Sequence, residues 1–387
     1  EDAHRLTASE FPQDAWGCSI AGGGNHALAW PRDGTQLYAC GSNKDGELAA
    51  ICGGEAEAVL KWTPVPFDAP RVRQAACGWN HTLVLGSDGL VRASGCNRHG
   101  QLGRGELGGA SGSDRHGQGE LGSASGWLPV DRLEPTLRFA AVACGMRHSL
   151  ALARDGRVFA WGANRSGQLG VAPDPSTKTV RTPRCVSEGL PRIALLAGGR
   201  SHSVLVAADR RTVFVAGQDK YGQCGPSAGD CVAGAWRSFV LPRRAVQLAS
   251  GWDSCAVVLE PSSSAPHNVL AWGRADHGQL ARRTQARFSR ELVEVPLAGV
   301  EALACGSNHA VARTSAGAVF LWGWNEHGNA GDPSLQDVFA PREVAGWPPR
   351  AVAGIGCGYG CSYIMLDKAS DPPSRQEEAC AVIQSIK

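Results

Sequence analysis

The sequence has no long apolar run, no excess of either charge and no closely paired cysteines. No window of about 18 apolar residues occurs, which excludes a membrane-spanning helix. The 387 residues carry 38 Lys and Arg against 36 Asp and Glu, a formal net charge of +2, so direct contact with nucleic acid through bulk charge is not expected. The 14 cysteines show no Cys-x-x-Cys spacing, which argues against a zinc site.

These absences limit the classes of function. The sequence contains no phosphate-binding GxxxxGK[ST] loop, no HExxH zinc motif and no GxSxG nucleophile, so we predict no covalent catalytic site, no metal and no cofactor. Scattered cysteines are typical of a reduced intracellular protein. We predict a cytoplasmic location, with the nucleus as a possible additional location.

The chain is also poor in methionine and rich in glycine. It has 2 Met, 50 Gly and 12 Trp, with 43% hydrophobic and 19% charged residues, a balance typical of a globular protein with a core. Glycine without a collagen period, together with tryptophan, is typical of short strands joined by tight turns.

A first motif, Gly-x-x-His followed by alternating apolar residues, recurs at intervals of about 52 to 55 residues, with one interval of about 67. Each copy starts at a glycine, namely Gly23, Gly78, Gly145, Gly199, Gly251, Gly306 and Gly358. Five copies end in a histidine, namely His26, His81, His148, His202 and His309. Histidines spread around a ring could not share one metal ion, so we predict that they satisfy buried backbone polar groups.

A second motif, apolar-x-Trp-Gly-x-Asn-x-x-Gly-Gln-Leu-Gly, follows each of the first six copies of the first motif. Copies with the tryptophan begin at Trp161, Trp272 and Trp322, and we predict that these side chains fill space between neighbouring sheets. In the first three repeats an Asp-Gly pair lies between the two motifs. Asp-Gly between alternating apolar runs predicts a hairpin turn.

Each period therefore holds four short strands, which is the content of one blade of a β-propeller. We predict an all-β, seven-bladed propeller over residues 1–367, acting as a monomer, and a polar C-terminal tail over 368–387. A duplicated segment rich in Gly and Ser, 103–127, predicts a mobile surface loop. Seven copies of the first motif against six of the second leave one blade without its closing strands, which we expect upstream of Glu1.

Both motifs resemble the repeats of the regulator of chromosome condensation family, from Ile20 to Met365. Within that family, three segments are most similar to the branch of secretion-regulating guanine nucleotide exchange factors: Cys40–Gly46, Trp272–Leu280 and Trp322–Gly328. The resemblance implies a propeller of that type that acts as a guanine nucleotide exchange factor or regulator of a small GTPase. It also implies a link to secretion through the exocyst.

The resemblance implies a site on one rim of the propeller. In the exchange factor for Ran, the important residues occupy the two variable positions before the repeated histidine, in the second, third and fifth repeats. Those repeats carry Trp79, Arg147 and Asp253 here, and only Asp253 keeps an acidic group. The complete predicted partner-binding rim is Asn25, Trp79, Asn80, Arg147, Arg200, Trp252, Asp253, Asn308 and Tyr359.

Trp, Tyr and Arg are the usual anchors of protein interfaces, and burial between blades is the alternative for Trp79 and Trp252. Three functions stay open at this point. The first is exchange on a small GTPase, and the second is a scaffold that binds a trafficking partner, such as an exocyst component, without exchange. The third is a chromatin-associated propeller.

Overall fold

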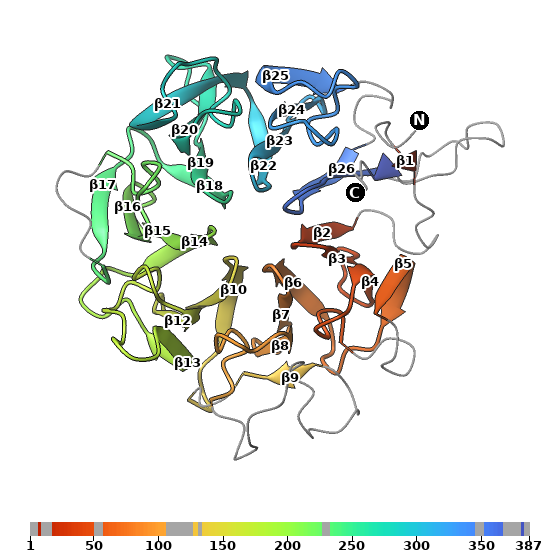
Figure 1. Ribbon diagram of the computed structural model, residues 1–387, viewed down its shortest axis with the longest axis vertical. Coiled ribbons are helices and arrows are strands. Elements are labelled where there is room, and N and C mark those ends of the chain that lie inside the picture. Colours follow the sequence, from red (N-terminus) through yellow and green to blue (C-terminus); the bar gives the residue numbers. More distant parts are fainter. Residues whose placement is uncertain are drawn as a thin grey trace.

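Six sheets of four antiparallel strands and one sheet of two strands stand around a central axis (Figure 1). The computed structural model describes residues 7–8, 18–49, 57–105, 127–130, 134–226, 233–344, 352–366 and 381–382. Within each sheet the strands follow one another in chain order, and the first strand lies nearest the axis. The chain is therefore an all-β propeller, as the period of the motifs predicted.

We number the four-stranded sheets as blades 1 to 6. The strands of blades 1 to 3 are β2 (Ser19–Gly22), β3 (His26–Trp30), β4 (Leu37–Ser42) and β5 (Ala58–Val65); β6 (Val72–Cys77), β7 (His81–Gly86), β8 (Val91–Gly95) and β9 (Leu128–Pro129); β10 (Phe139–Cys144), β11 (His148–Ala153), β12 (Val158–Ala163) and β13 (Thr179–Cys185). Those of blades 4 to 6 are β14 (Ile193–Gly198), β15 (His202–Ala207), β16 (Thr212–Gly217) and β17 (Arg237–Val240); β18 (Ala245–Ser250), β19 (Ser254–Leu259), β20 (His267–Arg274) and β21 (Phe288–Ala298); β22 (Val300–Cys305), β23 (His309–Thr314), β24 (Val319–Gly323) and β25 (Val338–Val344). The seventh sheet is β26 (Val352–Cys357) with β27 (Ser362–Leu366), and a short pair joins β1 (Thr7–Ala8) to β28 (Ala381–Val382).

The predicted number of seven blades is wrong, because the described residues form six complete blades. The reason lies in the uneven motif count. The Gly358 copy of the first motif builds β26 and β27, and no second motif follows it to supply a third and a fourth strand. Most of the predicted loop over 103–127 and most of the predicted tail over 368–387 lie outside the described residues.

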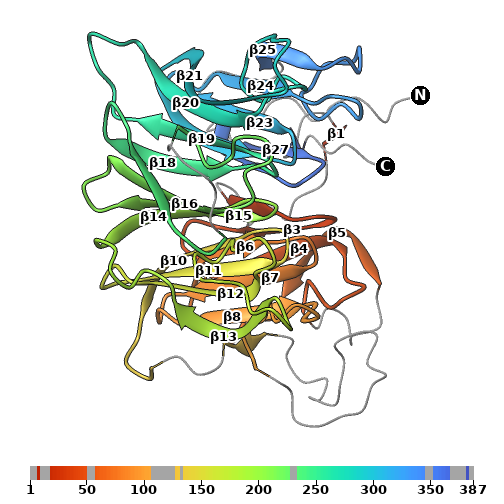
Figure 2. The same cartoon turned by 60° about the vertical axis from the view of Figure 1, so that its left-hand side comes forward.

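The core is divided among the seams between consecutive sheets, which pack face to face around the axis (Figure 2). Each apolar cluster joins strands of two neighbouring sheets, including one that joins the seventh sheet to blade 1. The three motif tryptophans, Trp161, Trp272 and Trp322, lie in these seams and are at most 1% exposed. Each indole N–H donates to the carbonyl of the glutamine that follows the turn glycine of the preceding blade (Gln101, Gln223 and Gln279), at 2.8–3.1 Å.

The repeated histidines also bridge the seams. Nε2 of His148 lies 3.0 Å from the Ser203 hydroxyl, which itself donates to the Gln168 carbonyl at 2.6 Å. Because that hydroxyl proton is already used, the imidazole must be the donor, so Nε2 carries the hydrogen and Nδ1 is unprotonated. Equivalent contacts join His26 to Thr82 at 2.9 Å and His81 to Ser149 at 3.1 Å.

Two histidines vary this contact. Nε2 of His202 lies 3.1 Å from the Cys255 sulfur and 3.0 Å from the Ser250 hydroxyl, and Nε2 of His309 donates to the Cys361 carbonyl at 3.2 Å. All five Nδ1 atoms are buried without a hydrogen-bond partner. Burial lowers the pKa of these histidines to about 3 or about 4.

The propeller should therefore lose stability in mild acid. Unfolding returns each histidine pKa to its ordinary value, so below about pH 6.5 the unfolded chain binds more protons than the folded one. The free energy of unfolding should fall by about 1.4 kcal/mol per pH unit for each buried histidine, down to about pH 4. We predict that His148→Gln, which keeps a donor for Ser203, makes this fall less steep by about one fifth.

Urea unfolding at several pH values between about 7 and 5 measures the slope. Val204→Ala is the matched control, because it truncates a buried side chain without removing a titrating group. An unchanged slope in His148→Gln would contradict the assignment of that histidine.

The glycine that opens the first motif is required by close packing. A Cβ at Gly145 would overlap the His148 imidazole and the Gly199 carbonyl, whereas a Cβ at Gly360 would meet nothing within 4 Å. We predict that Gly145→Ala costs more than about 2 kcal/mol of stability, because neither neighbour can retreat. Gly360→Ala should change it by less than about 0.5 kcal/mol, and equal losses in thermal unfolding would refute the prediction.

Candidate functional site

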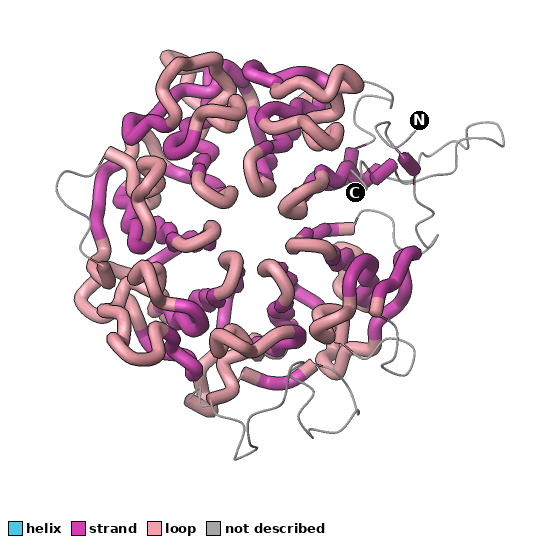
Figure 3. The backbone as a smooth tube through the Cα atoms, in the orientation of Figure 1, coloured by secondary structure: helices cyan, strands magenta, loops and turns pink. Residues whose placement is uncertain are grey.

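The two ends of the propeller carry different turns. Since neighbouring strands run in opposite directions, the turns between the first and second strands lie on the same face as those between the third and fourth strands. We call this the first face, and the Asp-Gly hairpins lie on the second face. The turns between first and second strands, here the axial turns, surround the axis (Figure 3) and contain every residue of the predicted rim.

The axial turns are joined by a closed circle of backbone hydrogen bonds, one across each seam. The N–H groups donate to carbonyls at 2.9–3.2 Å, from Gly24 to Gly78, Trp79 to Met146, Met146 to Gly199, Arg200 to Trp252, Trp252 to Ser307, Ser307 to Tyr359 and Tyr359 to Gly23. The two-stranded seventh sheet thus takes a full place in the circle. The circle holds the variable side chains of the rim at defined positions.

Three aromatic side chains of the rim meet at the axis. The rings of Trp79 and Tyr359 stack with centroids 5.7 Å apart, and Trp252 lies 5.9 Å from Trp79 and 5.7 Å from Tyr359. They come from blades 2 and 5 and from the seventh sheet. Trp79 and Trp252 therefore lie at the axis and not between blades, the alternative that the sequence left open.

Arg200 and Asp253 form an ion pair beside this aromatic cluster. The Arg200 guanidinium lies 6.0 Å from the centre of the Trp252 ring and 3.2 Å from Oδ2 of Asp253. The Asp253 side chain is fully buried, whereas that of Arg200 is 32% exposed. Oδ1 of Asp253 accepts a hydrogen bond from the Gln223 amide at 2.9 Å. Burial raises the pKa of Asp253, and the positive charge of Arg200 acts in the opposite direction.

The other rim residues fall into two groups. Asn80 and Asn308 are held by the third-to-fourth turn of the preceding blade: the Asn80 amide donates to Asp45 at 2.8 Å, and the Gln279 amide donates to the Asn308 oxygen at 3.1 Å. Asn25 and Arg147 are exposed. The structure thus brings Trp79, Trp252, Tyr359, Arg200 and Asp253 together and leaves Asn25, Asn80, Arg147 and Asn308 around them.

Sequence reasoning missed the residues that support the rim. Asp45, Gln223 and Gln279 lie in the third-to-fourth turns and each bonds a rim side chain of the next blade. For Gln223 and Gln279 the recurring Gly-Gln pair was a usable signal, because a glutamine that returns in several turns has a repeated partner. Asp45 lies outside that pair. The motif alone does not tell which side chain that partner is.

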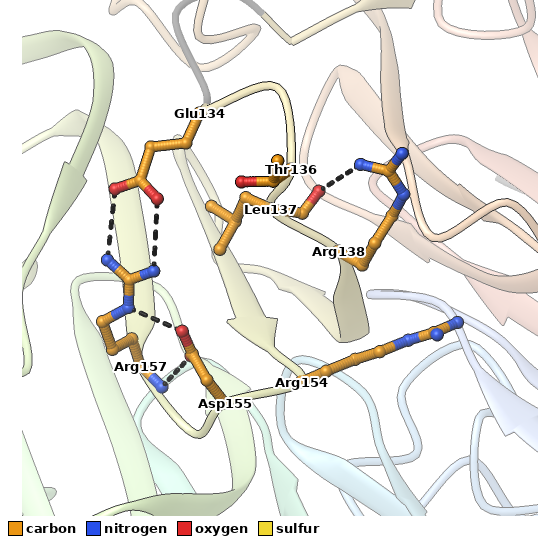
Figure 4. A pocket seen from close by; sticks show the side chains of 7 residues that line it. All are labelled: Glu134, Thr136, Leu137, Arg138, Arg154, Asp155 and Arg157. Carbon is orange, nitrogen blue, oxygen red and sulfur yellow. Dashed lines mark hydrogen bonds and ion pairs between the residues drawn. The ribbon is translucent and has the colours of Figure 1, made fainter.

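A hollow in the described part of the chain lies elsewhere. It measures about 330 Å³, sits on the second face and is lined by Glu134, Thr136, Leu137, Arg138, Arg154, Asp155 and Arg157. Figure 4 shows the Arg157 guanidinium facing both carboxylates, with Nε 2.8 Å from Asp155 and Nη1 3.3 Å from Glu134. The charged side chains that line the hollow are thus paired with one another. The hollow shares no residue with the rim.

The described side chains offer no metal centre. Within the described ranges, no group of three or more His, Cys, Asp or Glu side chains is placed to hold a metal ion. No helix in the same part of the chain has the length and apolar character needed to cross a membrane. What the rim offers is aromatic faces, a guanidinium and amides, which are groups that bind a protein surface.

Comparison with known proteins agrees with this geometry. Residues 7–366 match the family described as RCC1-like domain. The chain is 31% identical to the secretion-regulating guanine nucleotide exchange factor of Mus musculus over 412 residues, which cover 95% of this chain and 80% of that protein.

Two solved structures share the fold. Human WBSCR16 superposes with a TM-score of 0.76 at 25% identity, covering 94% of this chain and 89% of that chain. Prp20p of Saccharomyces cerevisiae superposes with a TM-score of 0.73 at 23% identity, covering 93% and 84%. These likenesses fit an RCC1-type propeller.

We predict that Arg200→Gln raises the pKa of Asp253 further, because the burial stays and the counter-charge is lost. A carboxyl whose pKa is higher in the folded than in the unfolded protein lowers the free energy of unfolding as the pH rises through the interval between the two values. The variant should therefore lose about 1–3 kcal/mol of stability at pH 7 and less at pH 5.

The difference in the free energy of unfolding between variant and parent, measured with urea at both pH values, tests this prediction. The contribution of the buried histidines is the same in the two proteins and cancels in that difference. In an Asp253→Asn background, Arg200→Gln should have no pH-dependent effect. A pH-dependent loss that persists in that background would refute the pairing.

Proposed function

The chain belongs to the family of RCC1-like domains, and from that premise we propose that it is a guanine nucleotide exchange factor or regulator of a small GTPase that acts through the first face. The mouse relative, named as a secretion-regulating guanine nucleotide exchange factor, aligns over nearly the whole chain. That extent supports the same class of activity here. The link to secretion is part of the proposal.

One observation carries the choice of surface. Trp79, Trp252 and Tyr359 form a cluster at the centre of the first face, with Arg200 beside it. Large aromatic and arginine side chains near the centre of an interface contribute most of its binding energy. The circle of backbone bonds holds their turns, so little ordering entropy would be lost on binding.

Exchange needs no chemical step from the protein. A factor that binds the nucleotide-free GTPase more tightly than the loaded form must loosen the nucleotide by the same factor, because the two binding events are linked. A rigid surface pressed against the nucleotide pocket is enough. We propose that the aromatic cluster of the rim provides this surface, and that the protein works in the cytoplasm.

A second function is favoured by the charges of the rim. Asp253, the one acidic group kept from the Ran-type pattern, is buried under Arg200, and Arg147 places an exposed cation at another of the three positions. The alternative we propose is a scaffold that binds a trafficking partner, such as an exocyst component, without changing the rate of nucleotide release.

Release of a fluorescent GDP analogue from a panel of small GTPases, Ran included, separates the two. We predict acceleration with one member and a loss of at least about tenfold of that acceleration in Trp79→Ala, because a central anchor is removed. Arg154→Ala is the control, since this exposed arginine lies on the second face.

Equal acceleration by Trp79→Ala and Arg154→Ala would show that the rim takes no part in nucleotide exchange. No acceleration of any GTPase by the folded protein would exclude exchange and leave the scaffold.

A further inference from the structure

Positive side chains gather on the first face at the seam between blades 2 and 3. Arg98 and His99 lie in the turn after β8, Arg147 lies in the axial turn of blade 3, and Arg181 lies on β13. Arg98, Arg147 and Arg181 are exposed, and His99 is half-buried. We call these four residues the seam cluster.

Backbone contacts bring the β13 member against the blade 2 turn. The Gly105 N–H donates to the Arg181 carbonyl at 3.0 Å, and a Cβ placed on Gly100 would lie 2.7 Å from Cα and 3.0 Å from Cγ of Arg181. Arg181 therefore runs directly over the residue that follows His99.

The turn after β8 also contacts strands β11 and β12 of blade 3, and β11 begins just after Arg147. The His99 N–H donates to the Gln101 side chain at 2.9 Å, and the Gln101 carbonyl accepts from the Ser149 hydroxyl at 2.7 Å and the Trp161 indole at 2.8 Å. Five hydrogen-bonded or packed contacts, all within the described residues, thus hold the turn of Arg98 and His99 against blade 3.

The charges in this cluster are all of one sign. Burial lowers the pKa of His99, and the charges of Arg147, Arg98 and Arg181 lower it further. Some exposed arginines of the propeller are paired with a carboxylate, as Arg290 is with Asp219 at 2.7 Å. Within the described part of the chain, neither Arg147 nor Arg181 forms an ion pair with a carboxylate. The guanidinium groups of Arg147 and Arg181, together with the His99 imidazole of the same seam, are donors that suit a compact anion.

We propose that the seam cluster binds a phosphate monoester, carried by a phosphorylated Ser or Thr side chain of a partner protein. A phosphate of this kind brings about 1.5 to 2 negative charges and three acceptor oxygens to one point, which matches several arginines better than a single carboxylate does. The cluster spans one seam, and the chain has a net charge of only +2. A long polyanion such as nucleic acid would need a continuous basic track. The site shares Arg147 with the rim, but the binding of a phosphate there does not require nucleotide exchange.

Titration with three probes tests this inference: inorganic phosphate, a short peptide with one phosphoserine and the same peptide unphosphorylated. The readouts are the His99 imidazole signals by NMR and the affinity by calorimetry, with sodium chloride at matched ionic strength as the blank. Phosphate and phosphopeptide should both shift the His99 signals, and the unphosphorylated peptide and chloride should not.

The variant Arg147→Ala, Arg181→Ala should weaken binding by about tenfold or more per arginine, because each loses a charge-assisted contact. Arg165→Ala should leave binding unchanged, since Arg165 is an exposed arginine in the equivalent turn of blade 3 and outside the cluster. An unchanged unfolding midpoint in the double variant shows that the loss is local.

Tighter binding of the phosphopeptide than of inorganic phosphate assigns the site to a phosphorylated protein segment. Equal binding of the phosphopeptide and inorganic phosphate would overturn the assignment to a phosphorylated protein and leave a site for small free phosphates. The whole inference is overturned if His99 does not respond to phosphate, if chloride produces the same shift, or if the double variant binds like Arg165→Ala.

Discussion

A closed circle of backbone hydrogen bonds around the axis is the contact on which the rest of this propeller depends. Each axial turn is tied to the next, so the ring closes through local bonds, and the seventh sheet belongs to it with only two strands. The first motif follows from this constraint. The opening glycine must lie against its own histidine ring, as Gly145 does on His148, and the histidine then reaches a hydroxyl of the next blade. Within the first motif, only the two positions between the glycine and the histidine are free to vary.

The motif period was enough to predict an all-β propeller, and the structure places Trp161, Trp272 and Trp322 in the seams. Periodicity works there because every blade repeats the same contacts. It failed on the number of complete blades, since a count of first motifs counts strand pairs and not blades. It also could not show that Trp79, Trp252 and Tyr359 meet. Those residues are far apart in the sequence, and only the closed ring brings three different sheets to one point.

The burial of Asp253 was equally hidden from the sequence. Its surroundings come from two other turns, which supply Arg200 and Gln223. An acid in that position suggests a group presented to a partner, yet the ion pair withdraws it and leaves the Arg200 guanidinium partly exposed. With Arg147 exposed on the axial turn of the neighbouring blade 3, the rim offers aromatic surface and positive charge. A partner that fits it would offer apolar and acidic groups, because like charges across an interface cost binding energy.

The same circle decides how the first face can recognise anything. Backbone N–H groups of tight turns often form anion-binding nests, but in each axial turn one N–H already joins its sheet to the next. Recognition there can come from side chains at the variable positions and in the neighbouring third-to-fourth turns. A substitution at Trp79 or Arg147 can therefore change the partner while the ring stays closed. Relatives with the same propeller can then bind different partners, because the contacts that hold the fold and those that select the partner use different atoms.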